Sequence, residues 1–532
     1  IIGELMCGIV GMAGNFNKEL LEAVLKSINH RGEDFSDIFI DGEKGIGLGH
    51  NLLSIFNLID ENNEIYDNLE YNKQPIILNN LVLVFNGEIY NFNKLEEFLR
   101  ENNEKYSKSK SDSQLLANLI SYYYNSNDEN LLESVKSVIH ELDADYSFAV
   151  YDKKHDNLAI SRDSIGVKPL FYGVDEEQDL KVFASEKKAL WKAGMADENI
   201  HDLTPGCILY NWRTVDLEDN LINKLINTDF KHIKSSYNEY KDYLETKDSY
   251  EVYNELLRDD LYSAVEKRVE NISNVGLIFS GGVDSTILAV LLKQIAENRN
   301  NNPIPLTIKL YSVGVENSQD IRFSKEIAEE LNLPIKTIII DETTVKESIK
   351  PVLTAIEDDN VMKLGVGMTI YLAAKAMKED NFKVALSGQG ADELFGGYNR
   401  YLKHFEEKSL FDAYFDLDEE IYHDISNMYH VNLERDDAVS MANGVELRVP
   451  FLDNDIINLA LDIPGKYKIR NNEDLLRKHI LRDVAKSIGV PDYIADRPKK
   501  AAQYGSGVNK ILKKKVLRSF DINEFINSLM EN

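Results

Sequence analysis

The sequence predicts two unlike domains, an α+β domain followed by an α/β domain built on a parallel sheet. Short β-type runs recur from Cys7 to about Tyr210, whereas apolar strands alternate with long amphipathic helices from Tyr243 onward. The stretch between these parts is polar and irregular, as linkers are. A chain of 532 residues also exceeds what one hydrophobic core usually serves. We therefore expect domains over residues 7–210 and 243–520, joined by a linker over residues 211–242.

The first domain is expected to have helices covering sheets. Its β-type runs are CGIVGMAG, GIGLGH, LVLVFNGEIYN, YSFAVYD, NLAISRD and KVFAS. Between them, KELLEAVLKSINHRG and SDSQLLANLISYYYN have the spacing of amphipathic helices. In the second domain, VGLIF precedes the helical STILAVLLKQIAEN, and KVALS precedes GADELFGGYNRYL, for which we also expect a helix. Strands followed at once by helices are typical of a parallel sheet with crossover connections.

Charge and cysteine content narrow the classes of partner and compartment. The chain has 60 basic and 90 acidic side chains, a net charge of -30, which repels nucleic acid and anionic membranes. We expect neither partner, and no run approaches the roughly 18 apolar residues of a membrane span. Its two cysteines, Cys7 and Cys207, offer no disulfide framework and no metal spacing, which favours the cytoplasm. Glu4 and the lack of a basic region argue against a secretory signal.

The clearest chemical motif is the stretch Ser280-Gly281-Gly282-Val283-Asp284-Ser285, between an apolar strand and a helix. Glycines let the backbone approach an anion, and hydroxyls and helix N-terminal N–H groups bind it, so a phosphate site is expected. No lysine follows, so this is not the G-x-x-x-x-G-K-[ST] loop. The alternative is a tight turn in which Asp284 or Ser285 caps the helix.

A second strand and glycine-rich turn, VALSGQGADELFGGYNRY, carries Asp392. Asp284 and Asp392 could together hold Mg²⁺ between the phosphates of ATP, because hard cations prefer carboxylate oxygens; either acid alone could be a surface charge. SGGVDS after an apolar strand resembles the pyrophosphate loop of the N-type ATP pyrophosphatases, of the adenine nucleotide alpha hydrolase-like fold. Those enzymes activate a carboxyl or carbonyl oxygen as an adenylate.

Further motifs are found in both halves of the chain. The first half contains MCGIVG, HRGEDFSD, NGEIYN, SDSQLL, RDSIGVKPLFY, ASEKKAL and TPG. The second half contains SGGVDS, LSGQGADELFGGY, RDDAVSMANGVELRVPFLD, LLRKHILRD and RPKK. In their order and spacing these motifs resemble those of the glutamine-hydrolysing asparagine synthetases over nearly the whole length after Met6. The resemblance implies an Ntn-hydrolase glutaminase, an αββα sandwich, joined to an ATP pyrophosphatase domain. Ammonia would pass between them through a tunnel inside the protein.

For the glutaminase half, the resemblance implies that Cys7 is the nucleophile and must begin the mature chain. Its own amine assists the chemistry, so we expect translation to start at Met6 and residues 1–5 to be absent. Asn86 and Gly87 would form the oxyanion hole, and the glutamine would be held by Arg31, Gly87, Glu88 and Asp112. From the residues alone, Cys7 could be a small buried hydrophobe, Asn86-Gly87 a turn, Asp112 a helix cap and Glu88 a solvated side chain.

For the synthetase half, the resemblance implies a site for ATP and pyrophosphate made by Leu277, Ser280, Gly281, Gly282, Asp284, Ser285, Val313, Ser387 and Gly388. Lys499 matches the lysine that neutralises charge on the adenylating phosphate. Without the resemblance, Lys499 would be one more solvated lysine. Aspartate would attack ATP to give β-aspartyl-AMP and pyrophosphate, and ammonia would then displace AMP. Mg²⁺ as cofactor and a homodimer are implied as well.

Three positions depart from the family's pattern. The arginine of H-x-R-L-S-I, which clamps the glutamine carboxylate, is Leu52 here, so another base such as Arg31 is needed or free ammonia competes. The glutamate of S-G-E-G-S-D-E, suggested to accept a proton from ammonia, is Gln389. A family arginine on the acceptor side falls on Gly365.

These departures leave three alternatives beside asparagine synthesis. One is a related amidotransferase acting on another carboxylate, or synthesis from ammonia with a weak glutaminase. A second is a non-catalytic regulator or storage protein with the same fold. A third is a tRNA-modifying adenylating enzyme, against which the acidic charge argues.

Overall fold

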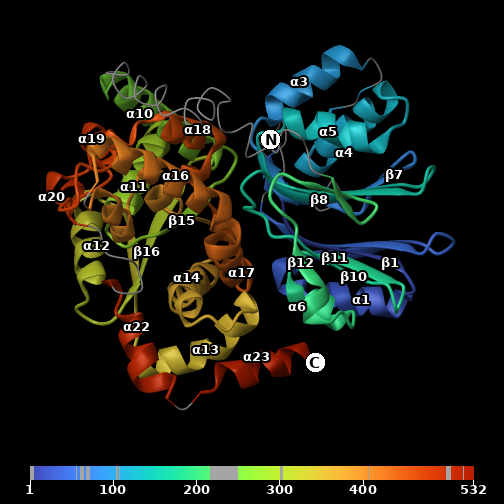
Figure 1. Ribbon diagram of the computed structural model, residues 1–532. Helices are drawn as coiled ribbons and strands as arrows, with labels where there is room; N and C mark the ends of the chain where they lie inside the picture. Colours follow the sequence, from blue (N-terminus) through green and yellow to red (C-terminus); the bar gives the residue numbers. More distant parts are fainter. Residues whose placement is uncertain are drawn as a thin grey trace.

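The computed structural model describes residues 5–55, 57–59, 65–67, 72–103, 106, 108–215, 250–299, 304–406, 408–498, 505–518 and 520–531. Two domains lie side by side, with the first in blue to green and the second in yellow-green to red (Figure 1). No helix of the described residues combines the length and the apolar character needed to cross a membrane. The last strand before residues 216–249, β14 (Arg213–Val215), still pairs with β13 (Ile208–Tyr210) of the first domain.

The first domain is a sandwich of β-layers between helices, as predicted. Its strands pair in the order β12-β10-β11-β1-β7-β8-β9-β13-β14, with β2, β3 and β6 as side branches. Helices α3, α4 and α5 lie on one side and α1 and α6 on the other (Figure 1). The remaining strands are β1 (Leu5–Gly14), β2 (Phe35–Asp41), β3 (Ile46–Ser54), β6 (Ile76–Leu78), β7 (Leu81–Ile89), β8 (Ala144–Asp152), β9 (Asn157–Arg162), β10 (Phe171–Asp175), β11 (Leu180–Ala184) and β12 (Ile200–Asp202), with a separate pair β4 (Asn57–Ile59) and β5 (Ile65–Asp67). The helices are α1 (Lys18–Ser27), α3 (Phe92–Asn102), α4 (Asp112–Ser126), α5 (Leu131–Glu141) and α6 (Lys187–Lys192).

Strand β7 shows why the layers form. Its side chains are buried on both faces, which is the pattern of a central strand rather than of a half-exposed one. Leu83 and Phe85 pack against the helices α3 to α5, whereas Val82 and Val84 point into the space between the two β-layers. The period of two along the strand therefore supplies two separate cores from one run of residues.

The second domain is built on a five-stranded parallel sheet in the order β17-β16-β15-β18-β19. In this order the chain first winds outward from β15 and then returns to its other side at β18, so a topological switch lies between β15 and β18. Ligands of such sheets bind at the carboxyl ends of the strands at the switch. The strands are β15 (Asn274–Ile278), β16 (Thr307–Gly314), β17 (Ile335–Ile339), β18 (Val384–Leu386) and β19 (Glu446–Arg448).

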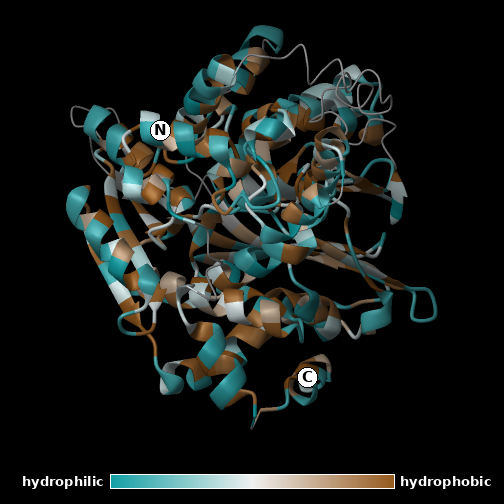
Figure 2. Cartoon of the chain, turned by 60° about the vertical axis from the view of Figure 1, so that its left-hand side comes forward, coloured by the Kyte–Doolittle hydropathy of each residue, from teal (hydrophilic) through white to brown (hydrophobic). Residues whose placement is uncertain are grey.

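Helices surround this sheet, and hydropathy follows the layers: brown, apolar stretches lie inside and teal, hydrophilic ones outside (Figure 2). They are α10 (Tyr250–Lys267), α11 (Val283–Asn298), α12 (Gln319–Glu330), α13 (Glu342–Ile356), α14 (Val361–Glu379), α15 (Ala391–Leu394), α16 (Leu410–Met428), α17 (Glu434–Met441), α18 (Asn454–Asp462), α19 (His479–Ser487), α20 (Asp492–Ala495), α22 (Val508–Ile511) and α23 (Ile522–Met530). Segments α22 and α23 pack in one apolar cluster with α13 and α14.

One predicted helix is wrong. The stretch GADELFGGYNRYL forms only the four-residue α15 and, further on, a 3-10 helix over Asn399–Phe405. The pair Gly396-Gly397 separates them, and Gly396 has a φ of +70°, which an α-helix does not accommodate. The Asp392 side chain is held close to this break, because a Cβ on Gly397 would lie 1.9 Å from its Oδ1 atom.

Candidate active sites

Cys7 lies where the space between the β-layers of the first domain changes from apolar to polar. An apolar layer of this space is formed by Ile9, Leu48, Val84 and Ala149. Two residues further along the same strands, on the same faces, stand Cys7, His50, Asn86 and Ser147, all fully buried. Asn86 and Ser147 are directly opposite each other on β7 and β8. Regular strand geometry therefore gathers four groups with chemistry at one end of the sandwich.

One polar group of this layer binds the backbone of Cys7, and several other polar atoms have no hydrogen-bond partner in the described structure. The Cys7 N–H donates a hydrogen bond of 3.2 Å to Asn86 Oδ1. Asn86 Nδ2, Ser147 Oγ and both ring nitrogens of His50 are buried and have no hydrogen-bond partner among the described residues. Burial lowers the pKa of His50 to about 3, so its imidazole stays neutral, and burial raises the pKa of the Cys7 thiol. An unpartnered amide donor beside a thiol is what an oxyanion hole requires.

Arg31 lies beside Cys7, as the resemblance implies; two of its guanidinium nitrogens are engaged, and the third, Nη2, is buried without a hydrogen-bond partner among the described residues. Its Nη1 donates hydrogen bonds of 2.8 Å to both Glu186 and Asp437, and its Nε donates one of 3.3 Å to the Cys7 carbonyl. The side chain is fully buried. Since Asp437 belongs to α17 of the second domain, Arg31 fastens the strand of Cys7 to that domain.

The two carboxylates predicted to hold glutamine, Glu88 and Asp112, line one small pocket together with Lys267. Asp112 Oδ2 accepts a hydrogen bond of 2.8 Å from the Ile89 N–H, which ties the start of α4 to the end of β7. The helix cap is Ser111, whose side chain accepts from the Gln114 N–H, so Asp112 has another role than capping. Glu88 continues β7 beyond Asn86 and Gly87, which places it next to the Cys7 layer.

Glu88 is also the end of a chain of buried charges that crosses between the domains. Arg448 Nη2, from β19, donates a hydrogen bond of 3.3 Å to Glu88 and one of 3.4 Å to Glu446. Glu446 in turn accepts one of 3.2 Å from Lys168 Nζ of the first domain. The Arg448 carbonyl accepts a hydrogen bond of 3.1 Å from the Ser387 N–H, in the second glycine loop. One arginine therefore touches both candidate sites.

The second site lies at the switch between β15 and β18, where the two glycine loops meet. A Cβ on Gly388 would lie 3.1 Å from the Asp284 Cβ, so the loops are in direct contact. Lys478 Nζ stands between the two predicted acids, 2.8 Å from Asp284 Oδ1 and 2.5 Å from Asp392 Oδ1. Lys478 is fully buried and has a left-handed backbone, with a φ of +53°. The motif LLRKHILRD contained this lysine, but its spacing did not indicate which position would face the loops.

The first glycine loop is shaped for close approach of a ligand. Gly281 has a φ of +67°, and a Cβ there would lie 2.9 Å from the Ser324 backbone nitrogen. Ser280 Oγ accepts from the Gly282 N–H at 3.3 Å and lies 3.4 Å from Ser285 Oγ. Helix α11 begins at Val283, so its free N–H groups point toward the loop. The other predicted contacts, Leu277 and Val313, lie near the ends of β15 and β16.

The stretch before Lys499 is anchored to this loop. Arg497 Nη1 donates a hydrogen bond of 3.0 Å to the Gly281 carbonyl, and its guanidinium carbon lies 3.9 Å from the Phe323 ring centroid. Lys499 itself lies outside the described residues. The chain therefore approaches the proposed phosphate site two residues before the predicted catalytic lysine.

The three departures have distinct surroundings. Leu52 is fully buried and packs with Phe35 against Cys7. The Gln389 N–H donates to Ser387 Oγ at 3.3 Å, within the second glycine loop. A Cβ on Gly365 would lie 3.1 Å from Asn509 Oδ1, a buried atom without a hydrogen-bond partner in the described parts of the chain. Asn509 of α22 therefore fills space that a larger residue at 365 would need.

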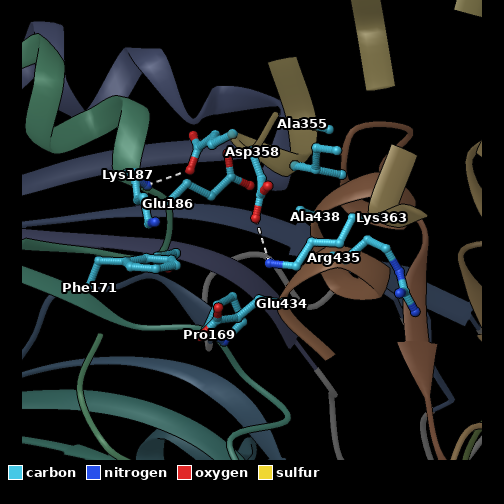
Figure 3. A pocket seen from close by; sticks show the side chains of 13 residues that line it. Pro169, Phe171, Glu186, Lys187, Ala355, Asp358, Lys363, Glu434, Arg435 and Ala438 are labelled. Atoms are coloured by element: carbon cyan, nitrogen blue, oxygen red, sulfur yellow. Dashed lines mark hydrogen bonds and ion pairs between the residues drawn. The ribbon is translucent and has the colours of Figure 1, made fainter. Parts of the chain in front are cut away.

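A polar pocket lies between the two domains (Figure 3). Its walls come from both domains and include Phe171 and Lys187 of the first and Asp358, Lys363 and Arg435 of the second. Lys363 Nζ donates a hydrogen bond of 2.6 Å to Asp358. The sequence analysis assigned nothing to this pocket.

Fold and sites together define an amidotransferase: a cysteine glutaminase of the αββα type joined to a nucleotide-binding synthetase. Comparison with known families agrees in both halves. Residues 6–243 match the glutamine amidotransferase domain, and residues 256–415 and 402–521 match asparagine synthase. The chain belongs to the glutamine-hydrolysing asparagine synthetases.

Relatives match over nearly the whole chain. A protein of Methanocaldococcus jannaschii that carries the name of a glutamine-hydrolyzing asparagine synthetase is 37% identical over 98% of this chain and 98% of its own. Asparagine synthetase B (glutamine-hydrolyzing) of Escherichia coli is 28% identical, over 94% of this chain and 82% of its own. The human asparagine synthetase (glutamine-hydrolyzing) is 24% identical, over 99% and 89%.

Proposed function

We propose that the protein makes asparagine from aspartate, glutamine and ATP, releasing glutamate, AMP and pyrophosphate through a β-aspartyl-AMP intermediate. The observation that supports this best is the link between the sites. Glu88, beside the Cys7 layer, contacts Arg448, whose carbonyl in turn accepts from Ser387 of the synthetase loop. Ammonia freed at Cys7 would therefore be released against the wall that carries the adenylation site.

In the glutaminase half, the Cys7 thiolate attacks the glutamine side-chain amide. Asn86 Nδ2 and the Gly87 N–H stabilise the oxyanion, ammonia leaves, and water then hydrolyses the γ-glutamyl thioester. Glu88 and Asp112 bind the glutamine ammonium group. The thiol needs a nearby base because its burial raises its pKa, and the α-amine of Cys7 would act as that base. This role requires cleavage of the Met6–Cys7 peptide bond.

In the synthetase half, the loop 280–285 binds pyrophosphate, Ser387 and Gly388 bind the α-phosphate, and Leu277 and Val313 line the adenosine site. Lys478 and Lys499 supply positive charge to the phosphates. Asp284 and Asp392 fit Mg²⁺ in part, because both carboxylates face one point, now taken by the Lys478 ammonium. The described residues contain no cluster of three or more ligands that could enclose an ion, so phosphate oxygens would complete the shell. Bound there, Mg²⁺ would neutralise phosphate charge.

The assembly and the compartment are also proposals. We propose a homodimer, on the resemblance to the family. We propose the cytoplasm, because both cysteines are buried thiols that form no disulfide, as expected in a reducing compartment.

A second candidate is an amidotransferase that acts on another carboxylate. Two observations favour it. Gln389 occupies the position where the family pattern has a glutamate suggested to accept a proton, and the Gly365–Asn509 contact stands in place of an arginine on the acceptor side. Both change the synthetase half and leave the glutaminase untouched.

The deciding experiment supplies the purified protein with ATP, Mg²⁺, aspartate and either glutamine labelled in its amide nitrogen or ammonia. Labelled asparagine together with equimolar pyrophosphate is expected. Pyrophosphate without asparagine would favour the second candidate, in which case a panel of other carboxylates identifies the acceptor. ATP binding without any pyrophosphate release would contradict both.

A further inference from the structure

Arg31 contacts the backbone of the nucleophile with one edge of its guanidinium. Its Nε donates a hydrogen bond of 3.3 Å to the Cys7 carbonyl. Nη2 is the nitrogen trans to Cδ, so in the planar guanidinium it lies on the same edge as the Nε–H group. Nη2 is therefore directed to the side on which Cys7 lies. It is buried and has no hydrogen-bond partner in the described parts of the chain.

The surroundings of the nucleophile give this nitrogen a use. The position at which the family pattern has an arginine for the glutamine carboxylate is Leu52, directly opposite Cys7 on β3. Leu52 packs with Phe35 against Cys7, so this side of the nucleophile is apolar. A carboxylate placed there would be desolvated without compensation, and a buried charged donor without a partner is costly as well. A charge-assisted hydrogen bond between a substrate carboxylate and Nη2 would satisfy both groups.

The direction of Nη2 depends in part on a residue of the other domain. Nη1 of Arg31 donates hydrogen bonds of 2.8 Å to Glu186 of the first domain and to Asp437 of α17 in the second. Glu186 also contacts His30 and Lys188, so three cations share its charge. Asp437 is buried and approaches Arg31 across the domain interface. With Nε bound to the backbone of the nucleophile, the two carboxylates on Nη1 fix the plane of the guanidinium.

We propose that Asp437 is a positioning residue of the glutaminase: it holds Arg31 so that Nη2 binds the α-carboxylate of glutamine. This inference rests on the proposed glutaminase activity. The cation that touches the substrate then belongs to the first domain, whereas a group that aims it belongs to the second. Glutamine affinity should therefore depend on how α17 docks against the glutaminase, and glutamine binding should in turn stabilise that docking.

The test is Asp437→Asn, which keeps the shape of the side chain and removes its charge. Arg31 retains Glu186 as a partner, so the variant should fold. Glutamine, glutamine α-amide, which lacks the free carboxylate, and ammonia are each supplied as nitrogen donor. We expect the KM for glutamine to rise about tenfold, as for a weakened charge-assisted hydrogen bond. The KM for the α-amide and the ammonia-dependent rate should stay unchanged.

The matched control is Asp436→Asn, the same change at the neighbouring buried position of α17. Asp436 accepts a hydrogen bond of 2.7 Å from Arg435 Nε and so pairs within its own helix. The KM of this variant for glutamine should equal that of the wild type. An equal rise in both variants would mean that the changes only disturb α17, and it would overturn the inference.

Calorimetry of glutamine binding tests whether Asp437 acts through Arg31. The protein carries Cys7→Ala, so binding is measured without hydrolysis. Arg31→Lys keeps a cation for the two carboxylates but removes Nη2, and it should lower the affinity for glutamine about tenfold or more. Asp437→Asn added to Arg31→Lys should lower the affinity no further, whereas independent contributions would multiply.

These measurements separate the inference from the activity on which it rests. If the wild type hydrolyses no glutamine, the proposed function fails while the binding measurement still tests Asp437. Unchanged glutamine affinity in Asp437→Asn, an equal loss for glutamine and its α-amide, or losses that multiply in the double variant would each overturn the inference.

Discussion

The site around Cys7 and the site at the glycine loops differ in whether their polar side chains have partners. Around Cys7, Asn86 Nδ2, Ser147 Oγ and the His50 nitrogens are buried without partners in the described structure. At the loops, the acids Asp284 and Asp392 are both engaged by Lys478. The first site therefore has hydrogen-bond donors available to stabilise a charge that develops during the reaction. At the second site, substrate and metal must displace existing ion pairs.

This difference follows from the secondary structure that builds each site. Four adjacent strands fix the Cys7 layer, and their hydrogen-bonded registers leave its side chains little freedom. The other site consists of two loops and the residue before α19, so its charged side chains are not fixed by the register of a sheet. A site on strands can keep costly open donors because nothing nearby can turn to meet them.

The largest expected effect comes from Cys7→Ala. Glutamine-dependent synthesis should fall by about a thousandfold or more, because the covalent route is lost. Ammonia-dependent synthesis should remain at the wild-type rate, because the loop site is intact. Both rates are measured as asparagine formed per enzyme. Equal loss of both activities would show that the sites do not work separately.

Lys478→Met should affect the site at the glycine loops rather than the site around Cys7. We expect pyrophosphate release to fall by about a hundredfold with either nitrogen donor, while glutamine hydrolysis continues. The change also removes the buried ammonium that Asp284 and Asp392 share, so the free energy of unfolding should fall by about 3 kcal/mol or more at neutral pH without ligand. Steady-state assays and denaturant unfolding measure the two effects.

The control for this variant is Lys486→Met, on the same helix α19 but at the surface beside Asp496. It should change neither quantity beyond about 0.5 kcal/mol or a twofold rate. If Mg²⁺ and ATP restored the stability of Lys478→Met fully, the acids would be bound by metal as proposed. If Mg²⁺ and ATP left the stability of Lys478→Met unchanged, Asp284 and Asp392 would not belong to the metal site.

The two sites also differ in how far the sequence predicts them. Strand periodicity predicts the α+β domain and the parallel-sheet domain, and the motifs predict that the two glycine loops meet, whereas the αββα sandwich and the place of Cys7 next to Asn86 follow from the family resemblance. Lys478 was missed because its position depends on a left-handed backbone at two non-glycine residues, Arg477 and Lys478. The pairings of Arg31 with Asp437 and of Arg448 with Glu88 join residues hundreds of positions apart. Such contacts depend on how the domains dock, which no local pattern specifies.

A moderate effect is expected from a change at Arg448, which contacts residues of both candidate sites. Arg448→Met should lower glutamine-dependent synthesis about tenfold relative to ammonia-dependent synthesis, because Glu88 loses one of the contacts that hold it near the Cys7 layer. Glutamine hydrolysis without asparagine formation should rise. A double-mutant cycle with Glu88→Gln should give a coupling of about 0.5–3 kcal/mol. Strictly additive effects would mean that the ion pair joins the domains without linking their chemistry.

The smallest expected effect concerns a carboxyl group at the interface between the two domains. It tests whether this group is ionised and paired, as the acids at the glycine loops are. Glu434, on α17, is partly buried, and desolvation raises its pKa to about 7 from an ordinary value of 4.5, although Arg162 Nη2 donates to it at 3.1 Å. A carboxyl whose folded pKa is raised contributes stability that is fully present below its unfolded pKa. That contribution is lost as the pH rises through the folded pKa.

Glu434→Gln removes this titration and keeps an acceptor for Arg162, whose guanidinium also donates to the carbonyls of Lys168, Leu203 and Gly166. The variant should therefore unfold at nearly the wild-type temperature at about pH 5 and at a higher temperature at about pH 8. The gain should be at most about 3 kcal/mol, the full value of the pKa difference. Thermal unfolding across this range measures it. A gain that is the same at both pH values would show that Glu434 stays ionised in the folded protein, and that the interface pairs its charges as completely as the loops do.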